Sequence, residues 1–434
     1  MKLKEHFSNV KPSATLAMNQ KVLRMWSKGK NVFHLGFGES RFPIHPDLVH
    51  ELTVHATKQS YLSSLGINEL REKISVFFQE NYGFNVVDPD SIIIGIGSKS
   101  LLHTILSILD GPVLLSVPSW VSYSSIAKLT NHPVYRFYLD DKRSYKVDLD
   151  ALFDCADQAQ NDTGKPPILI LNSPNNPTGR MLSKNEIKEI ANGARKRNMV
   201  VLSDEIYGLI THGDNSHDSI RTLYPEGTIV FNGISKHLSL GGWRFGFSLI
   251  PDNAGQDLVN ACDTVISNIW SCVPAPIQHT VMKAFQPDNE LTNYIKTCTR
   301  IHDIRTRYLY DHLTDLNISC PEPQGAFYLY PNLGDKKQIL GKINITTDIE
   351  LAEFLLEKYE LATLPGEAFG DNAENLSLRL ATSYLDMEDD TKAEAILRAY
   401  QKDPIAVNFI RKHHPRTQEA ANRFGQFMND IVSG

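Results

Sequence analysis

Short apolar runs alternate with amphipathic stretches from about residue 60 to residue 250 of this 434-residue chain. Apolar runs bounded by turn residues are typical of buried strands, and apolar residues spaced three and four apart are typical of helices. A chain that alternates the two folds into a mainly parallel sheet covered by helices, and its ligands bind at the carboxyl ends of the strands. We therefore predict an α/β fold. The expected strands are 91–96, 113–117, 134–138, 168–171, 199–203, 228–231 and 245–250, and the expected helices include 98–109, 123–131 and 184–197.

The pattern changes beyond about residue 290, where a long helical stretch at 291–316 precedes a strand-like alternation at 323–330. These segments predict a smaller α+β domain, which a helix at 11–30 and a strand at 31–35 would join. We predict a large cofactor-binding domain at 46–289 and a small domain made of 1–45 and 290–434. Its other expected elements are a helix at 348–359, strands at 361–365 and 376–381, and an amphipathic tail after Asp403 that breaks at Pro415 and turns a basic cluster at 411–414 to solvent.

One lysine, Lys236, is expected between two buried strands, in the segment FNGISKHLSLGGWRFG at 231–246. Burial of an ammonium group is costly unless its charge is neutralised or its amine is used in a covalent bond. An imine formed with an aldehyde would explain such a lysine. Arg244 follows in the same segment, and its planar guanidinium can bind two oxygens of a phosphate at once. An ordinary surface position is the alternative for Lys236.

Polar motifs follow the expected strands, at the edge of the sheet where a ligand would bind. Gly97, Ser98 and Lys99 lie between a strand and the start of a helix, where free backbone N–H groups could hold a phosphate. The motif lacks the third glycine and the downstream acid of a dinucleotide-binding fingerprint, so a structural turn is the alternative. Trp120 follows the next strand and could stack on a planar ring, or simply pack.

Two later strand ends carry more specific signals. The loop LNSPNNPTGR at 171–180 requires a defined conformation, and Asn176 within it offers an amide to a phenolic oxygen. Asp204 closes a buried strand, so its carboxylate needs a partner. A protonated pyridine nitrogen would serve, and the carboxylate would keep it protonated so that the ring acts as an electron sink. Tyr207 could donate to the oxygen of the same ring.

Two positions are candidates for substrate binding. Arg379 lies inside the expected strand at 376–381, where a guanidinium is either part of a buried salt bridge or the receptor for a carboxylate. Gly38 lies in the sequence GFGE, in which two glycines would let the backbone face a ligand or would simply form a turn.

The composition argues against several function classes. Apolar residues make up 41% and charged residues 22% of the chain, and the formal net charge is -6, so nucleic acid and acidic membranes are poor default partners. We find neither an apolar stretch long enough for a membrane span nor a signal sequence. The five cysteines are scattered and none forms a CxxC pair, which favours free thiols in the cytoplasm and no bound metal.

Together, the order and spacing of these motifs resemble the fold type I pyridoxal-phosphate enzymes, specifically the class I/II aminotransferases, over residues 12–384. The resemblance implies that Lys236 is the Schiff-base lysine of pyridoxal 5'-phosphate. It implies that Asp204 binds the pyridinium nitrogen, and that Tyr207 and Asn176 donate to the 3-oxygen of the ring.

The phosphate end of the cofactor is also assigned by the resemblance. Gly97, Ser98 and Lys99 would form the phosphate cup with Arg244, and Tyr61 would reach the phosphate of the neighbouring subunit in a homodimer. One position departs from the family, which usually has a serine three residues before the lysine, where this chain has Gly233. The adjacent Ser235 is not the equivalent of that serine.

The resemblance implies transfer of the amino group of an L-amino acid to a 2-oxo acid. Trp120 would stack on the cofactor, Arg379 would fix the substrate α-carboxylate, and Gly38 would face the substrate. The freed amine of Lys236 would then move the Cα proton. Phe37, Trp270 and Phe369 favour apolar or aromatic substrates.

Three alternatives to a transaminase stay open at this point. A β-eliminating C–S lyase and a cyclase of the aminocyclopropane-carboxylate synthase kind would use every one of these residues. A non-catalytic binding protein, such as the aminotransferase-like half of certain transcription regulators, is disfavoured because Lys236 is intact and no basic helix-turn-helix segment precedes the fold.

Overall fold

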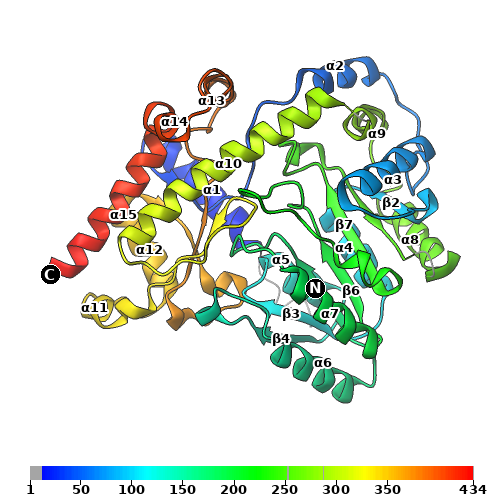
Figure 1. The fold of residues 1–434 in the computed structure, drawn as a ribbon, viewed down its shortest axis with the longest axis horizontal. Helices are drawn as coiled ribbons and strands as arrows, with labels where there is room; N and C mark the ends of the chain where they lie inside the picture. The colour runs from blue at the N-terminus through cyan, green and yellow to red at the C-terminus, as the bar shows by residue number, and fades with distance from the viewer. Residues whose placement is uncertain (1–11, 252–253, 287, 434) are drawn as a thin grey trace, which may run out of the picture.

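A computed structural model describes residues 12–251, 254–286 and 288–433. The centre of the molecule is a seven-stranded sheet in the order β2-β8-β7-β6-β5-β3-β4 (Figure 1). Every neighbouring pair is parallel except the two that involve β8, which runs antiparallel to β2 and β7. The predicted α/β fold with a mainly parallel sheet is confirmed. The strands are β2 (Ile92–Gly95), β3 (Val113–Val117), β4 (Val134–Tyr138), β5 (Ile168–Asn172), β6 (Val200–Asp204), β7 (Thr228–Gly233) and β8 (Gly246–Leu249).

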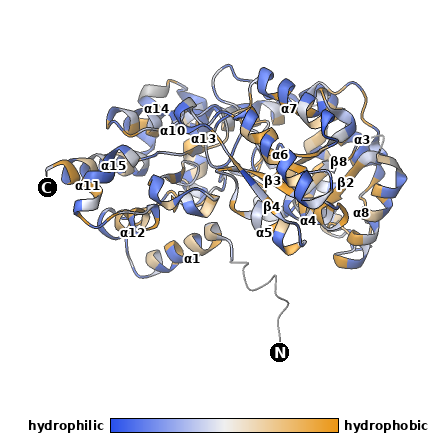
Figure 2. Ribbon diagram, turned by 90° about the horizontal axis from the view of Figure 1, so that it is seen from below, coloured by the Kyte–Doolittle hydropathy of each residue, from blue (hydrophilic) through white to orange (hydrophobic). Residues whose placement is uncertain are grey.

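Helices cover both faces of this sheet. Successive side chains of a strand point to opposite faces, and β3 shows this, because Val113 and Leu115 pack with α4, α5 and α8 while Leu114 packs with α6 and α7. Figure 2 shows the apolar strands enclosed by helices whose outer surfaces are polar. The helices are α4 (Ser98–Ile108), α5 (Val121–Leu129), α6 (Leu149–Thr163), α7 (Lys184–Lys196) and α8 (Gly255–Ile269).

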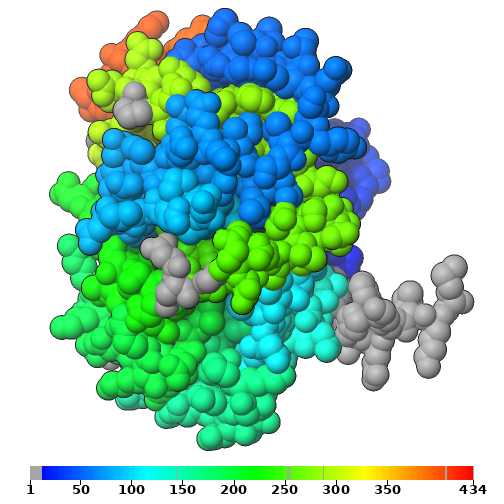
Figure 3. All heavy atoms as spheres, turned by 90° about the vertical axis from the view of Figure 1, so that its right-hand side faces the viewer, coloured from blue at the N-terminus to red at the C-terminus, as the bar shows by residue number. Residues whose placement is uncertain are grey.

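Three more helices complete this part of the chain, α2 (Pro46–His55), α3 (Asn68–Tyr82) and α9 (Ala275–Val281). Both α2 and α3 contact α9, and the blue and yellow-green segments lie together on one side of the molecule (Figure 3). The long connection between α2 and α3 carries Tyr61, whose side chain is exposed.

A second group of strands joins the two ends of the chain. β1 (Phe33–His34) pairs in parallel with β10 (Leu361–Ala362), and β11 (Leu364–Pro365) pairs with β12 (Leu378–Ala381). The strand expected at 361–365 is therefore divided between two sheets. β9 (Tyr328–Leu329), which pairs with β12, is much shorter than the alternation at 323–330 predicts. The helices around these strands are α1 (Ala14–Ser27), α11 (Lys337–Lys342) and α12 (Asp348–Tyr359).

The long helix α10 (Asn289–Asp315) connects the two parts (Figure 1). Leu291 and Ile301 pack in the same core as Phe77 and Phe247, whereas Leu313 packs in the core around α12. We propose the division into a domain at 46–289 and a domain made of 1–45 and 290–434, supported by the pairing of β1 with β10. The first half of α10 then forms the contact between the two domains.

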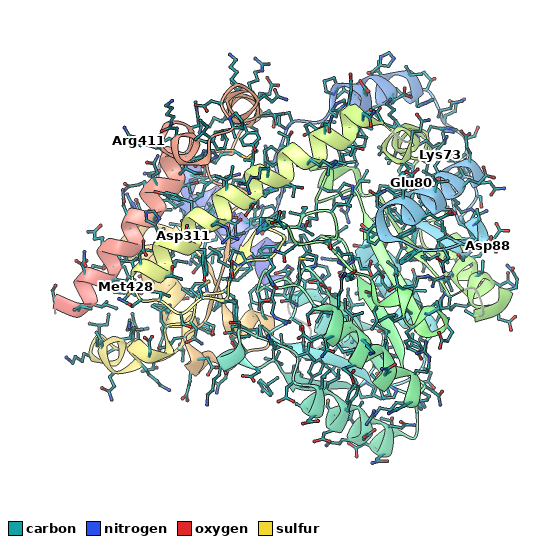
Figure 4. All side chains as sticks on the ribbon, viewed as in Figure 1. Lys73, Glu80, Asp88, Asp311, Arg411 and Met428 are labelled. Atoms are coloured by element: carbon teal, nitrogen blue, oxygen red, sulfur yellow. The ribbon has the colours of Figure 1, made fainter. Side chains whose placement is uncertain are left out.

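The described C-terminal residues form three helices, α13 (Asp390–Lys402), α14 (Ala406–His413) and α15 (Pro415–Ser433). The predicted tail after Asp403 comprises α14 and α15, and the break lies at Pro415 as predicted. Figure 4 shows Arg411 at the outer edge of the molecule, and Met428 of α15 is buried. The prediction that the whole of 411–414 faces solvent is wrong for His414, whose ring is fully buried against Phe409. The apolar residues of α14 and α15 therefore close over this histidine.

Candidate active site

A cavity of about 440 Å³ lies at the carboxyl ends of the central strands. This volume is within the range of small-molecule sites, roughly 300–1,000 Å³. A larger groove of about 800 Å³, between α3, the loop at 208–217 and α10, contains none of the predicted site residues. The smaller cavity is lined by ten of them: Gly38, Ser98, Lys99, Trp120, Asn176, Asp204, Tyr207, Lys236, Arg244 and Arg379.

Lys236 projects into this cavity from the loop after β7. Its Nζ donates a 2.8 Å hydrogen bond to the backbone oxygen of Gly38. Burial lowers the pKa of Lys236 to about 8, with Glu39 opposing the shift and Arg379 adding to it. An amine with this pKa is partly neutral near physiological pH, and only the neutral amine is a nucleophile. Lys236 is therefore not the ordinary surface lysine that its segment left possible.

Asp204 is the last residue of β6 and is buried at the floor of the cavity. Its Oδ2 accepts a 2.7 Å hydrogen bond from the hydroxyl of Tyr123, and its Oδ1 accepts one of 3.2 Å from the backbone N–H of Ile206. Burial raises the pKa of Asp204 to about 6, and the hydrogen bond from Tyr123 opposes this rise. A carboxylate buried at this depth can accept a hydrogen bond from a protonated ring nitrogen.

Tyr123 is a site residue that the sequence reasoning missed. It was expected only as the first residue of a helix, but it lies in the first turn of α5 and lines the cavity. The one signal in the sequence is its position three residues after Trp120, which places both rings at the same strand end. The two rings meet edge to face, with centroids 5.1 Å apart.

The loop after β5 holds Asn176 beside Asp204. Asn172 bridges the two, because its Oδ1 accepts from the Asn176 backbone N–H at 2.8 Å and its Nδ2 donates to the Asp204 backbone oxygen at 2.9 Å. The side-chain oxygen of Asn176 is buried and has no hydrogen-bond partner within the described residues. Buried polar atoms are normally paired, so this oxygen can accept a hydrogen bond from a ligand, whereas donation to a ring oxygen would use the Nδ2 of the same amide.

The phosphate end lies where α4 begins. Gly97 is the N-cap of α4 and has a φ of +88°, and Arg244 also has a positive φ, +54°. A Cβ on Gly97 would overlap Nη2 of Arg244 in its present position, so the glycine leaves room for the guanidinium beside the helix N-terminus. Free N–H groups and a cation then meet at one point, which suits a phosphate.

A steric constraint accounts for Gly233, the glycine that stands three residues before Lys236. Gly233 belongs to β7 and pairs with Gly246, and a Cβ on it would lie 2.9 Å from the backbone oxygen of Phe245. Ser235, which we discounted from the sequence, lines the cavity and offers a hydroxyl. Lys99 points elsewhere, with its Nζ 4.8 Å from the centroid of the Trp120 ring.

Arg379 is 1% exposed and forms no ion pair with any described residue. Its Nη2 donates to the backbone oxygen of Gly36 at 2.6 Å, while its Nε is buried without a partner. The ring of Tyr328 lies 4.9 Å from its Cζ. The described residues therefore offer no salt-bridge partner for Arg379, and its role as the receptor for a carboxylate stays a prediction.

Some predicted residues lie outside the cavity. Tyr61 is 88% exposed and does not line it within this single chain. Among the three aromatic residues named for substrate preference, Phe37 lines the cavity, whereas Trp270 and Phe369 do not. The cavity wall also includes residues from the N-terminal segment that the sequence reasoning did not name, Ser13, Thr15 and Leu16.

Two searches of the described residues bear on other kinds of site. No group of three or more histidine, cysteine, aspartate or glutamate side chains in these ranges is arranged to hold a metal ion. Likewise, none of the helices in the described ranges combines the length and apolar character that crossing a membrane requires.

The family model for aminotransferase class I and II matches residues 30–396. The aspartate aminotransferase of Geobacillus stearothermophilus is 31% identical over 394 residues, which cover 88% of this chain and 95% of that protein. The asparagine–oxo-acid transaminase of Streptococcus mutans is 27% identical over 89% of this chain and 97% of its own length. The solved structure of Thermus thermophilus aspartate aminotransferase with maleate has a TM-score of 0.79 and 25% identity, covering 93% of this chain and 99% of that one.

Pyridoxal phosphate fits the residues that are present. Four groups in the cavity wall suit the parts of this cofactor. The buried Asp204 suits the pyridine nitrogen, the Nδ2 donor of Asn176 suits the ring oxygen, the Arg244 guanidinium at the start of α4 suits the phosphate, and the Lys236 amine suits the aldehyde. With the family match over most of its length, the chain belongs to the class I and II aminotransferases, which are pyridoxal-phosphate-dependent enzymes.

Proposed function

We propose that this aminotransferase takes the amino group from an acidic L-amino acid, with aspartate as the first candidate, and transfers it to a 2-oxo acid. The names of the relatives support this substrate class. The observation that carries the proposal is a cation in the cavity besides Arg379 and the two assigned to the cofactor, Lys236 and Arg244. Lys99 lines the cavity together with Arg379, and neither side chain forms an ion pair with a described residue.

The positions of the two cations suit a substrate with two carboxylates. Arg379 would bind the α-carboxylate through its planar fork. Lys99 would bind the side-chain carboxylate, while its backbone N–H stays in the phosphate cup at the start of α4. Burial lowers the pKa of the Lys99 amine, and Arg244 adds to this shift, so a neighbouring carboxylate would relieve an unfavourable charge. This proposal replaces the apolar or aromatic preference expected from the sequence.

The remaining roles follow from the geometry at the cofactor. When bound, pyridoxal phosphate supplies the electron sink that weakens the Cα–H bond of the amino acid. Asp204 would hold the proton on the ring nitrogen, and Asn176 and Tyr207 would donate to the ring oxygen. Trp120 would pack against the ring. Backbone and hydroxyl groups of Gly97, Ser98 and Ser235, with Arg244, would hold the phosphate.

Proton transfer is assigned to Lys236. Its amine, whose pKa burial lowers to about 8, would accept the Cα proton of the bound amino acid and hold it during the transfer. Arg379 would fix the carboxylate and thereby the direction of the Cα–H bond. Gly38 accepts a hydrogen bond from the resting Lys236, and it faces the substrate once the lysine has moved.

We also propose that the enzyme is a cytoplasmic homodimer. Tyr61 is 88% exposed in the single chain, so its side chain is accessible to a partner subunit, as the dimer would require. In the dimer, Tyr61 would reach the phosphate site of the partner. Five free cysteines support a reducing compartment.

The substrate proposal is tested by Lys99→Met, with Lys128→Met as the matched control. Lys128 is an exposed lysine of the neighbouring helix α5. We expect Lys99→Met to lower kcat/KM for aspartate by roughly 10- to 100-fold, as for the loss of a charged hydrogen bond, and to leave alanine turnover nearly unchanged. Equal losses for both substrates would contradict the role of Lys99. Pyruvate and ammonia released from cystathionine without a 2-oxo acid would instead support the β-eliminating lyase.

A further inference from the structure

Tyr328 contacts three of the site residues and has no role in the function proposed so far. It is the first residue of β9, it lines the cavity, and it is 1% exposed. Its hydroxyl lies 2.7 Å from the hydroxyl of Tyr207. Its ring lies under the guanidinium of Arg379, 4.9 Å from Cζ.

Gly38 shows how closely Tyr328 approaches the substrate side of the cavity. A Cβ on Gly38 would overlap the hydroxyl and the nearest ring atoms of Tyr328. The glycine therefore leaves room for this phenol. The backbone oxygen of Gly38 also accepts the hydrogen bond from Lys236, so the same glycine lies against the phenol and binds the amine.

The direction of the hydrogen bond between the two phenols follows from the function of Tyr207. A phenol has one proton to donate, and its oxygen can accept another hydrogen bond. If Tyr207 gives its proton to the ring oxygen of the cofactor, it can only accept from Tyr328. The two hydroxyls then form a chain that ends at the cofactor, and each bond in such a chain strengthens the next.

The contact with Arg379 gives Tyr328 a second effect. A guanidinium held flat over an aromatic face keeps a fixed orientation, which a bidentate carboxylate contact requires. Among the described residues, the one hydrogen bond recorded for the Arg379 guanidinium is the bond to the backbone oxygen of Gly36, and the ring of Phe369 lies 5.3 Å from its Cζ. The ring of Tyr328, which is the nearer of the two rings, is thus one of two aromatic constraints on the carboxylate receptor.

We propose that Tyr328 is a positioning residue that links the cofactor to the substrate carboxylate, through its hydroxyl on Tyr207 and its ring under Arg379. The proposal rests on the proposed function, since it requires Tyr207 to bind the cofactor. It predicts separable effects for the two halves of the side chain. The hydroxyl tunes the cofactor, and the ring tunes substrate binding.

The test uses the cofactor-loaded enzyme and the variants Tyr328→Phe, Tyr328→Leu and Tyr330→Phe. Tyr330 is the matched control, because it is a fully buried phenol two residues away that donates to Asp371 and does not line the cavity. The first readout is the pH titration of the visible absorbance band of the bound cofactor. The second is KM for the amino acid, measured separately from kcat.

We expect Tyr328→Phe to raise the apparent pKa of the visible band. A weaker donor from Tyr207 leaves more negative charge on the ring oxygen, which then holds the proton on the Lys236 nitrogen more tightly. Tyr207→Phe should give a larger shift in the same direction. The double variant should match Tyr207→Phe alone, because Tyr328 acts on the cofactor through Tyr207.

The ring is tested by the second readout. Tyr328→Phe keeps the ring and should change KM less than threefold, whereas Tyr328→Leu should raise KM at least tenfold. The proposal would be overturned if the band of Tyr328→Phe were unshifted, or if Tyr330→Phe showed the same shift. It would also be overturned if the shifts in the double variant were additive, or if Tyr328→Phe and Tyr328→Leu had equal KM values. If the wild-type protein itself shows no band with pyridoxal phosphate, the proposed function fails together with it. A normal wild-type band with unaffected variants removes only the role of Tyr328.

Discussion

The hydroxyl of Tyr123 donates to Oδ2 of Asp204 at 2.7 Å, and this bond joins the first turn of α5 to the end of β6. The bond favours the ionised form of a carboxyl group whose pKa burial raises to about 6. Asp204 must be ionised to hold a proton on the cofactor nitrogen. If Asp204 binds the ring nitrogen as proposed, Tyr123 would support the electron sink through its bond to Asp204.

Replacing Tyr123 by phenylalanine tests this support. We expect kcat/KM to fall by roughly 10- to 100-fold, the usual effect of losing a hydrogen bond to a charged group. The loss should be larger at pH 6 than at pH 8, because without the donor the pKa of Asp204 rises further and more of it is protonated at low pH. The measurement is the pH profile of kcat/KM. Tyr135→Phe is the control, since Tyr135 donates at 3.0 Å to the exposed Asp162 far from the cavity; an equal effect of both variants would contradict the role of Tyr123.

Gly97→Ala should disrupt the phosphate end of the site. The new Cβ would overlap Nη2 of Arg244, and the φ of +88° disfavours any side chain. We expect the dissociation constant for pyridoxal phosphate to rise at least tenfold. The variant Gly83→Ala separates the effect of the positive φ from the effect of the contact with Arg244. Gly83 also has a positive φ, +66°, but an added Cβ there would meet no atom within 4 Å. Similar cofactor affinity in the two variants would show that the contact with Arg244 is unimportant.

Lys236 should destabilise the cofactor-free chain at neutral pH. Its pKa falls from 10.5 to about 8 on folding, so the cost of burying the ammonium is fully present below pH 8 and is lost as pH rises to 10.5. The shift corresponds to about 3 kcal/mol. We therefore expect Lys236→Met to raise the free energy of unfolding at pH 7 by an amount of this order. Urea unfolding at pH 7 and pH 10 measures the difference, and a difference that does not shrink with pH would argue against a buried amine.

The variant Arg379→Lys should weaken substrate binding far more than it alters cofactor binding. Lysine keeps the charge but loses the planar fork that binds two carboxylate oxygens, so KM for the amino acid should rise by roughly 10- to 100-fold. The absorbance band of the bound cofactor should be retained, which shows that the variant is folded. Steady-state kinetics with aspartate provide the measurement, and an unchanged KM would remove Arg379 from the carboxylate role.

The central sheet could be predicted almost strand by strand, because each strand is an apolar run bounded by turn residues. The division at 361–365 could not be predicted, since β10 and β11 are separated only by their pairing with distant strands. The strand-end rule and the family resemblance together identified ten residues that line the cavity. Tyr123 and Tyr328 were missed because their contacts, to Asp204 and Tyr207, connect residues 81 and 121 positions apart. A hydrogen bond between two such side chains leaves no local pattern in the sequence.

The most direct test of the central claim is the absorbance spectrum of the purified protein with pyridoxal phosphate, recorded before and after L-aspartate and again after a 2-oxo acid. We expect a visible band that aspartate removes and the 2-oxo acid restores. The variant Lys236→Ala should not form this band in the same way. The account would be contradicted if the protein stayed colourless with the cofactor. It would also be contradicted if neither aspartate nor any other common L-amino acid removed the band.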